Sequence, residues 1–164
     1  MKTTGTHKGR SPLFFLALAC LLLVLVSACS KKPGDEDLIR QAVHDAVEAA
    51  GAKDVSGFIS VLSKDYSDDY GNDYDAARGI IFYQFMRPGE ISVFIRSLDI
   101  KVTGQSAAVN ARAVLVRGKP VKGIASVIPG DAEAYSFRLV FKKEAGDWKV
   151  AGAGWEAVGV AGLL

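Results

Sequence analysis

The spacing of apolar residues divides the chain after residue 34 into a helical part and a strand part. Between Asp35 and Gly51 the apolar residues lie mostly three or four positions apart, at Leu38, Ile39, Ala42, Val43, Ala46 and Val47. A period of about 3.6 residues predicts an amphipathic helix. Asp35 is suited to cap the start of this helix, and Gly51 is suited to the left-handed conformation that often follows a helix end.

Two further helices are expected before residue 90. Asp54 can cap a short helix whose apolar residues are Val55, Phe58, Ile59 and Leu62. A third helix is expected from about Asp73, its cap, to Met86, because a Pro-Gly pair follows. The Tyr- and Asp-rich residues 65–72 are expected to form the turn between these two helices.

After residue 88 the apolar residues alternate with polar ones, which predicts β-strands. Ile91, Val93 and Ile95 alternate, and the alternation then resumes with opposite parity at Leu98. This change of parity indicates a bulge or kink near Ser97. Further strands are expected at residues 107–117, 135–142 and 148–155, and residues 124–128 are a candidate short strand.

Three helices followed by about four antiparallel strands predict an α+β domain, in which the helices cover one face of a curved sheet. Alternation along the last strand puts Trp155 on the opposite face from Trp148 and Val150. One tryptophan would then face the core or a cavity, and the other would be available to a partner. The apolar residues 158–164 are expected to pack on their own domain. The alternatives are that they close the open end of the domain, cover a sheet edge or bind a partner.

Three segments resemble proteins of the NTF2-like fold, also called the SnoaL-like or cone-shaped α+β fold. They are AAGAKD at residues 49–54, LSKDY at residues 62–66 and KKEAGDWKV at residues 142–150. The resemblance extends over about residues 35–157. It implies a cone whose open end is a pocket lined by apolar and aromatic side chains. It implies little about activity, because enzymes, transport adaptors and assembly proteins share this fold.

The first 29 residues have the layout of an export signal. Lys2, Lys8 and Arg10 precede an apolar run from residue 13 to residue 26. Secretory signals have an apolar run of roughly 7–15 residues, whereas a membrane-spanning helix needs about 20. The run ends in Val26-Ser27-Ala28-Cys29, which resembles the lipobox of bacterial lipoproteins. The resemblance implies that residues 1–28 are removed and that Cys29 is diacylated.

This processing would leave a lipid-bearing tether, residues 29–34, and a domain, residues 35–164. Acyl chains on Cys29 would hold the protein on a membrane without a spanning segment. Ser30 stands where enteric bacteria have an aspartate that retains lipoproteins in the inner membrane, which favours the outer membrane, facing the periplasm. An uncleaved signal anchor is one alternative. Acylation of Cys20 is another, but it would leave the apolar residues 21–26 exposed at the new N-terminus.

Composition excludes several classes of function for the domain. Removing residues 1–28 removes three of the 20 basic residues and no acidic one, which leaves 17 basic against 18 acidic side chains. No basic cluster longer than Lys31-Lys32 or Lys142-Lys143 remains, so we expect no nucleic-acid partner. With Cys29 acylated, the domain has no free cysteine for a disulfide, a nucleophile or a metal site.

The domain offers few residues for metal or cofactor chemistry. His44, its only histidine, lies on the polar face of the first helix four residues before Glu48, which predicts a solvent-exposed pair. A single histidine disfavours a zinc site and a Ser-His-Asp triad. Residues 65–77 do not match an EF-hand, so we expect no metal, with a looser cation site as the alternative. We expect no cofactor, and close packing at Gly152-Ala153-Gly154.

Five residues remain as site candidates. Aligning the chain with ketosteroid isomerase, an enzyme of this fold, leaves its two oxyanion donors unmatched and places Tyr70, beside Asp69, near its catalytic base. Tyr66, Tyr70, Tyr83 and Trp155 are candidates to line a pocket for a small apolar or aromatic ligand; the alternative is that they belong to the core.

The sequence thus favours a membrane-anchored envelope protein that binds a ligand or acts as a scaffold without catalysis. The alternative is a small-molecule enzyme of the isomerase or dehydratase type that uses Asp69 and Tyr70. A homodimer formed through the open face of the sheet is a third hypothesis.

Overall fold

The computed structural model describes residues 32–118 and 120–163. The predictions for residues 1–31, lipidation of Cys29 included, lie outside this part of the chain. Three helices lie in its first half, α2 (Asp35–Ala52), α3 (Val55–Ser60) and α4 (Tyr74–Met86). None of the helices in the described ranges combines the length and the hydropathy that crossing a membrane requires.

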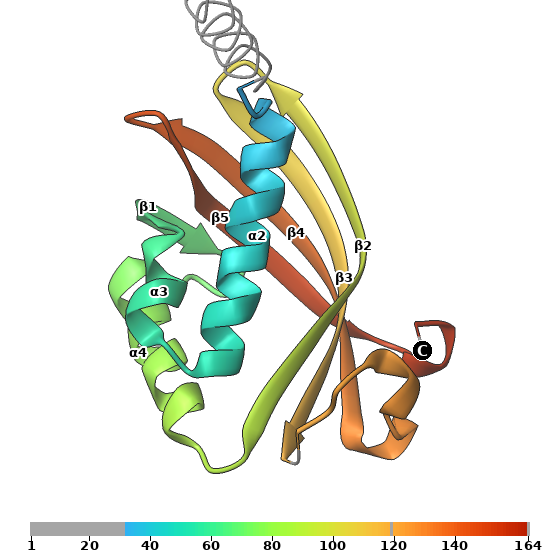
Figure 1. Cartoon of the computed structure of the whole chain (residues 1–164). Helices are drawn as coiled ribbons and strands as arrows, with labels where there is room; N and C mark the ends of the chain where they lie inside the picture. Colours follow the sequence, from blue (N-terminus) through green and yellow to red (C-terminus); the bar gives the residue numbers. More distant parts are fainter. Residues whose placement is uncertain (1–31, 119, 164) are drawn as a thin grey trace, which may run out of the picture. The chain divides into compact units, whose positions relative to one another are not determined.

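The second half of the chain forms most of a five-stranded sheet with the order β1-β5-β4-β3-β2. The strands are β1 (Leu62–Asp68), β2 (Glu90–Thr103), β3 (Ser106–Gly118), β4 (Ala132–Glu144) and β5 (Asp147–Val158). Figure 1 shows the long strands curving around α2, with α3 and α4 beside the β1 edge. We call the face turned toward α2 the inner face and the opposite face the outer face.

The fifth strand, β1, corrects the expectation of a turn at residues 65–72 and of an all-antiparallel sheet. β1 pairs with β5 in parallel, with Ser67 opposite Gly152 and Asp68 opposite Ala153. Its buried residues are Ser63 and Tyr66, which do not alternate regularly. The strand forms because β5, far along the chain, offers a free edge, and local sequence contains no sign of such a partner.

The helix boundaries follow the predicted caps in two cases out of three. The carboxylates of Asp54 and Asp73 accept the backbone N–H groups of the third residue of α3 and α4, as predicted. At α2, however, Gly34 is the N-cap and Asp35 is the first helical residue. The left-handed position after α2 belongs to Lys53, with φ of 54°, instead of Gly51, which lies inside the helix.

Two bulges decide which side chains reach the inner face. Arg96 is the extra residue in β2, which confirms the bulge predicted near Ser97. Ala151 is the extra residue in β5, because Val150 pairs with Phe141 and Gly152 with Val140. This second bulge shifts the alternation by one residue, so Trp155 lies on the same inner face as Trp148. The prediction of opposite faces was therefore wrong.

The inner face is filled by side chains. One cluster contains Ile39 of α2 with Val109, Phe141 and Trp148 of the sheet, and a second contains Ala50, Phe85 and Ile91. Asp35 fixes the start of α2 to the β4–β5 hairpin, because it accepts hydrogen bonds from Lys143 Nζ (2.5 Å) and Trp148 Nε1 (3.1 Å).

A third cluster lies on the outer face. Val114, Val116 and Ala134 are covered there by residues 121–127 and by Val160 and Leu163 of the C-terminal tail. The tail thus packs on its own domain, as predicted. Residues 124–128, the candidate short strand, instead belong to a connection with two short 3₁₀ helices, Ile124–Ser126 and Pro129–Asp131. The three clusters use only residues between Leu38 and Leu163, so this part of the chain contains its own core.

Candidate functional site

Four aromatic side chains lie together on the inner face outside the three core clusters. We call Tyr70, Tyr135, Phe137 and Trp155 the aromatic surface. Phe137 of β4 is directly opposite Trp155 of β5. The Tyr70 and Trp155 rings are 4.8 Å apart, and the Tyr135 and Phe137 rings are 6.0 Å apart. Tyr70 is 65% exposed and the other three are partly buried, so the surface is open to a ligand.

The turn after β1 positions Tyr70. The Asp68 carboxylate accepts hydrogen bonds from the backbone N–H groups of Tyr70 (3.0 Å) and Asn72 (2.9 Å) and from the Asn72 side chain (3.0 Å). Burial acts to raise the pKa of Asp68, but these hydrogen bonds outweigh it and lower the pKa. The hydroxyl of Tyr70 donates to the backbone oxygen of Trp155 at 3.3 Å. The carboxylate therefore fixes the tyrosine over the tryptophan.

The Asp69 side chain lies on the outer face of the sheet, whereas the Tyr70 ring lies on the inner face. Its carboxylate is 3.1 Å from the guanidinium of Arg138, a residue of the outer face. It also lies directly over Gly154, where a Cβ would collide with it, which confirms the close packing predicted for this glycine. The structure does not bring Asp69 and the Tyr70 ring to the same face, so the pair proposed for acid–base chemistry does not share a pocket.

The remaining tyrosine candidates occupy other places. Tyr66 is only 7% exposed and belongs to the inner core cluster. Burial, and then the nearby charge of Asp68, raises the pKa of Tyr66 to about 12. Tyr83 lies on the side of α4 that faces solvent and is 68% exposed. Of the predicted pocket residues, only Tyr70 and Trp155 come together.

Sequence reasoning missed the other half of the aromatic surface. Tyr135 and Phe137 share one face of β4 with Leu139 and Phe141, but the position at which the core ends along that face depends on how far α2 covers it. The Tyr135 hydroxyl donates to Glu133 at 2.9 Å, and burial together with this contact raises the pKa of Tyr135. A neutral phenol is the form present at pH 7.

Among the described residues, those best placed to hold a metal ion lie on α2 rather than near the aromatic surface. Side-chain atoms of His44, Asp45 and Glu48 lie within 4.8 Å of one another, and all three residues are exposed. His44 is 3.8 Å from Glu48, as the spacing predicted. Three solvated side chains on one helical turn are common on protein surfaces, and nothing further indicates an ion there.

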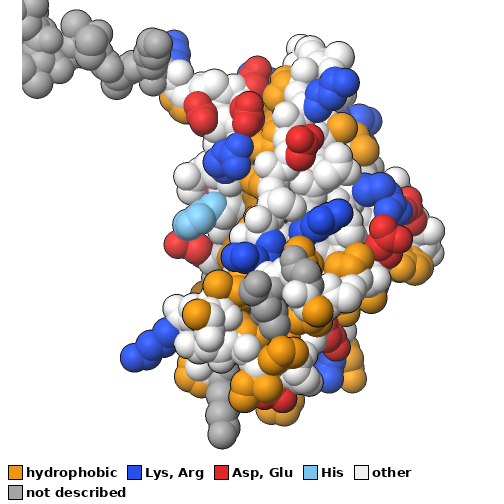
Figure 2. Space-filling view, turned by 90° about the vertical axis from the view of Figure 1, so that its right-hand side faces the viewer, with side chains coloured by type: hydrophobic (Ala, Val, Ile, Leu, Met, Phe, Trp, Pro, Cys, Tyr) orange, Lys and Arg blue, Asp and Glu red, His pale blue; other side chains and the backbone are white. Residues whose placement is uncertain are grey.

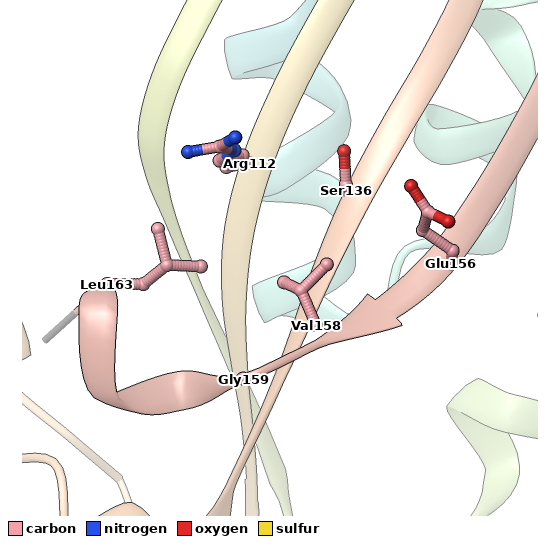
Figure 3. Close-up of a pocket in the computed structure, with 6 residues that line it drawn as sticks. All are labelled: Arg112, Ser136, Glu156, Val158, Gly159 and Leu163. Carbon is pink, nitrogen blue, oxygen red and sulfur yellow. The ribbon is translucent and has the colours of Figure 1, made fainter.

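The outer face contains a shallow hollow of about 220 Å³ beside the C-terminal tail. Figure 3 shows Arg112, Ser136 and Glu156 on neighbouring strands, with Val158 and Leu163 below them. Glu156 is 3.7 Å from Arg138. The hollow is smaller than the roughly 300–1,000 Å³ of typical ligand pockets, and none of the described residues that line it is aromatic. On the side of the molecule drawn in Figure 2, basic and acidic side chains are interspersed.

Comparison with known proteins identifies the fold. No protein-family model matches the sequence, and no curated protein matches it. Among solved structures, an NTF2-like protein of unknown function from Pseudomonas putida KT2440 aligns with a TM-score of 0.59 and 16% identity, over 73% of this chain and 84% of that one.

Two other solved structures give the same result. An NTF2-like protein with a cystatin-like fold from Novosphingobium aromaticivorans aligns with a TM-score of 0.59 and 16% identity, over 92% of both chains. A protein from Streptomyces avermitilis, named as a candidate dehydratase of the NTF2-like family, aligns with a TM-score of 0.62 and 15% identity, over 76% of this chain and 96% of that one. At these identities the matches establish the fold alone: the domain has the NTF2-like, cystatin-like α+β fold.

Proposed function

We propose that this protein is a lipid-anchored lipoprotein of the bacterial cell envelope whose domain binds a small apolar or aromatic ligand without transforming it. The observation that supports binding is the aromatic surface, an exposed set of four rings beside a core that is otherwise filled. Flat rings favour offset or edge-to-face contact with other aromatic groups, which suits a planar ligand.

The surroundings of the aromatic surface favour binding over catalysis. A general acid or base must reach the reacting atom with a proton it can give or take near neutral pH. Tyr70 already donates to the Trp155 backbone, and Asp69 is held by Arg138 on the outer face. Tyr135 has a raised pKa and already donates its proton to Glu133.

The position of the tether is compatible with access from the periplasm. The tether would join the start of α2, which Asp35 fixes to the β4–β5 hairpin. Phe137 lies seven residues before Glu144, where β4 ends at this hairpin. At about 3.3 Å per residue, roughly 20 Å separates the aromatic surface from the tethered end of the domain. A ligand could therefore approach while the lipid remains in the membrane.

Titration with N-phenyl-1-naphthylamine, a neutral aromatic fluorophore, tests the binding proposal. The chain from residue 30 onward should enhance its fluorescence saturably, and Trp155→Ala and Tyr70→Ala should each weaken the affinity at least tenfold. Val140→Ala is the matched control, because Val140 is a 47% exposed apolar residue on the outer face. Equal affinity of Trp155→Ala and the control would refute the site, and turnover of a bound compound would refute a non-catalytic role.

Labelling cells with an alkyne-tagged fatty acid tests the anchor separately. Label should appear on the wild type and on Cys20→Ser and be absent from Cys29→Ser, and the mature N-terminus should be residue 29 by mass spectrometry. Label that depends on Cys20, or a protein that retains its initiator methionine, would overturn the proposed processing without affecting the binding proposal.

A further inference from the structure

Helix α4 has more exposed large hydrophobic residues than any other element in the described part of the chain. Eight large hydrophobic residues of the described chain are exposed, and four of them lie on this single helix, at Ile80, Phe82, Tyr83 and Met86. Their exposed fractions run from 47% to 69%. A helix that is apolar on every side is normally buried on every side. Contiguous apolar patches of this kind mark interaction surfaces.

The opposite side of α4 already has its partners. Tyr74, Ala77, Ile81 and Phe85 point into the inner core clusters. With about 3.6 residues per turn, the direction opposite Ile81 is occupied by Ala76, Gly79, Tyr83 and Met86. The elements that pack closely on α4 are α3 and β1, and a Cβ added at Gly79 would meet open space. The outward side of α4 is therefore a free helix face.

We infer that this face binds a second copy of the same chain. The two α4 helices would be antiparallel, and the twofold axis that relates them would cross each helix on its outward side, at the level of Ile81. About that axis, Gly79 lies opposite Tyr83 of the second copy, and Ala76 lies opposite its Met86. Each small residue would thus receive a large one, the arrangement that lets helices approach closely. A twofold contact needs a self-complementary surface, and this pattern is self-complementary.

The charges at the two ends of α4 select the antiparallel direction. Asp75 is exposed near the N-terminus of the helix and Arg87 is exposed directly after its C-terminus. Antiparallel helices bring the acidic end of each copy next to the basic end of the other, and their dipoles also oppose. Parallel helices would instead place Asp75 beside Asp75 and Arg87 beside Arg87.

The size of the contact sets the expected strength. A 13-residue helix is about 20 Å long, so one helix pair buries less than the roughly 1,200–2,000 Å² of a standard interface. We therefore expect a weak dimer with a dissociation constant in the micromolar range. The contact uses no residue of the aromatic surface, so it stands or falls independently of ligand binding.

Sedimentation equilibrium of the chain from residue 30 onward tests the inference. The wild type should show a monomer–dimer equilibrium, and Met86→Lys should raise the dissociation constant at least tenfold. Val140→Lys places the same charge on the exposed outer face of the sheet and should change nothing. A wild type that stays monomeric at several hundred micromolar overturns the inference, and so does a dimer that Val140→Lys dissociates and Met86→Lys does not.

Two further variants separate this geometry from nonspecific association. Gly79→Leu makes the face more apolar but fills the space that Tyr83 of the second copy would occupy. It should therefore weaken the dimer, and a stronger dimer would contradict the proposed packing. Asp75→Arg and Arg87→Asp should each weaken self-association, and a mixture of the two variants should restore it as a heterodimer. Failure of the mixture to associate would refute the antiparallel arrangement. Circular dichroism of each variant confirms that α4 remains folded.

Discussion

Replacing Asp68 tests whether its carboxylate organises the turn that holds Tyr70. In Asp68→Asn the N–H groups of Tyr70 and Asn72 and the Asn72 amide lose their charged acceptor. Hydrogen bonds to a charged group contribute about 1.5–3 kcal/mol each in buried sites. This turn is only half-buried, and water can form part of the lost hydrogen bonds. We therefore expect the free energy of unfolding to fall by about 1–2 kcal/mol in total.

The pH dependence of the effect gives the sharper test. The folded-state pKa of Asp68 lies below its ordinary value, because its hydrogen bonds outweigh the opposing effect of burial. A carboxyl group with a lowered folded-state pKa stabilises the protein above its unfolded pKa of about 3.9, and this stabilisation is lost as the pH falls through the folded-state pKa. The stability difference between wild type and Asp68→Asn should therefore be greatest near pH 7 and shrink progressively in acid.

Urea unfolding followed by far-ultraviolet circular dichroism between pH 7 and pH 2.5 measures this difference. Asp65→Asn is the matched control, since Asp65 is exposed on the same strand and its carboxylate accepts no hydrogen bond from the described residues. Asp68→Asn should also weaken binding of the aromatic fluorophore, because the turn places Tyr70 on Trp155. A difference that stays constant with pH, or an Asp68→Asn variant as stable as the control at pH 7, would refute the role assigned to the carboxylate.

Three further predictions concern the fold. Phe141→Ala should reduce the free energy of unfolding by about 3–5 kcal/mol in urea titrations, because Phe141 is almost fully buried at the centre of the inner core; a loss under 1 kcal/mol would contradict this position. Asp35→Asn should lower the melting temperature at pH 7, and this difference from the wild type should disappear as the pH falls through the folded-state pKa of Asp35, which the hydrogen bond from Lys143 holds below its ordinary value. Gly89→Ala should reduce the free energy of unfolding by about 1–3 kcal/mol in urea titrations, because φ of Gly89 is +90° and the new Cβ would be 3.0 Å from Gly118. An unchanged urea midpoint would contradict this prediction and show that the turn relaxes.

The elements that sequence predicted well are those specified by neighbouring residues. The caps at Asp54 and Asp73 act on N–H groups three residues away, so composition and spacing locate them. The bulge near Ser97 leaves a visible trace, because both halves of β2 keep apolar residues on the inner face and the parity must change between them. The fold class followed from this order of helices and strands.

The features that sequence could not predict depend on contacts between distant residues. β1 is a strand only because β5 lies beside it, and its own residues resemble a polar turn. Lys53 adopts the positive φ that was predicted for Gly51, because the contacts of α2 with β2 and α3 extend the helix through Gly51 to Ala52. Predicting the aromatic surface requires knowing where along β4 the helices stop covering the inner face. That position depends on how the elements pack together and not on the sequence of any one segment.

The bulge at Ala151 connects the fold to the proposed site. With regular alternation, Trp155 would share the outer face with Arg138, and Glu156 would take its place beside Phe137. One extra residue in β5 reverses this, so Trp155 joins Phe137 on the inner face and Glu156 joins Arg138 on the outer face. Because Asp68 pairs with Ala153 just beyond the bulge, the same shift brings the turn of Tyr70 to the tryptophan. The aromatic surface is thus a consequence of strand register, which explains why residue spacing in β5 alone gave the wrong face.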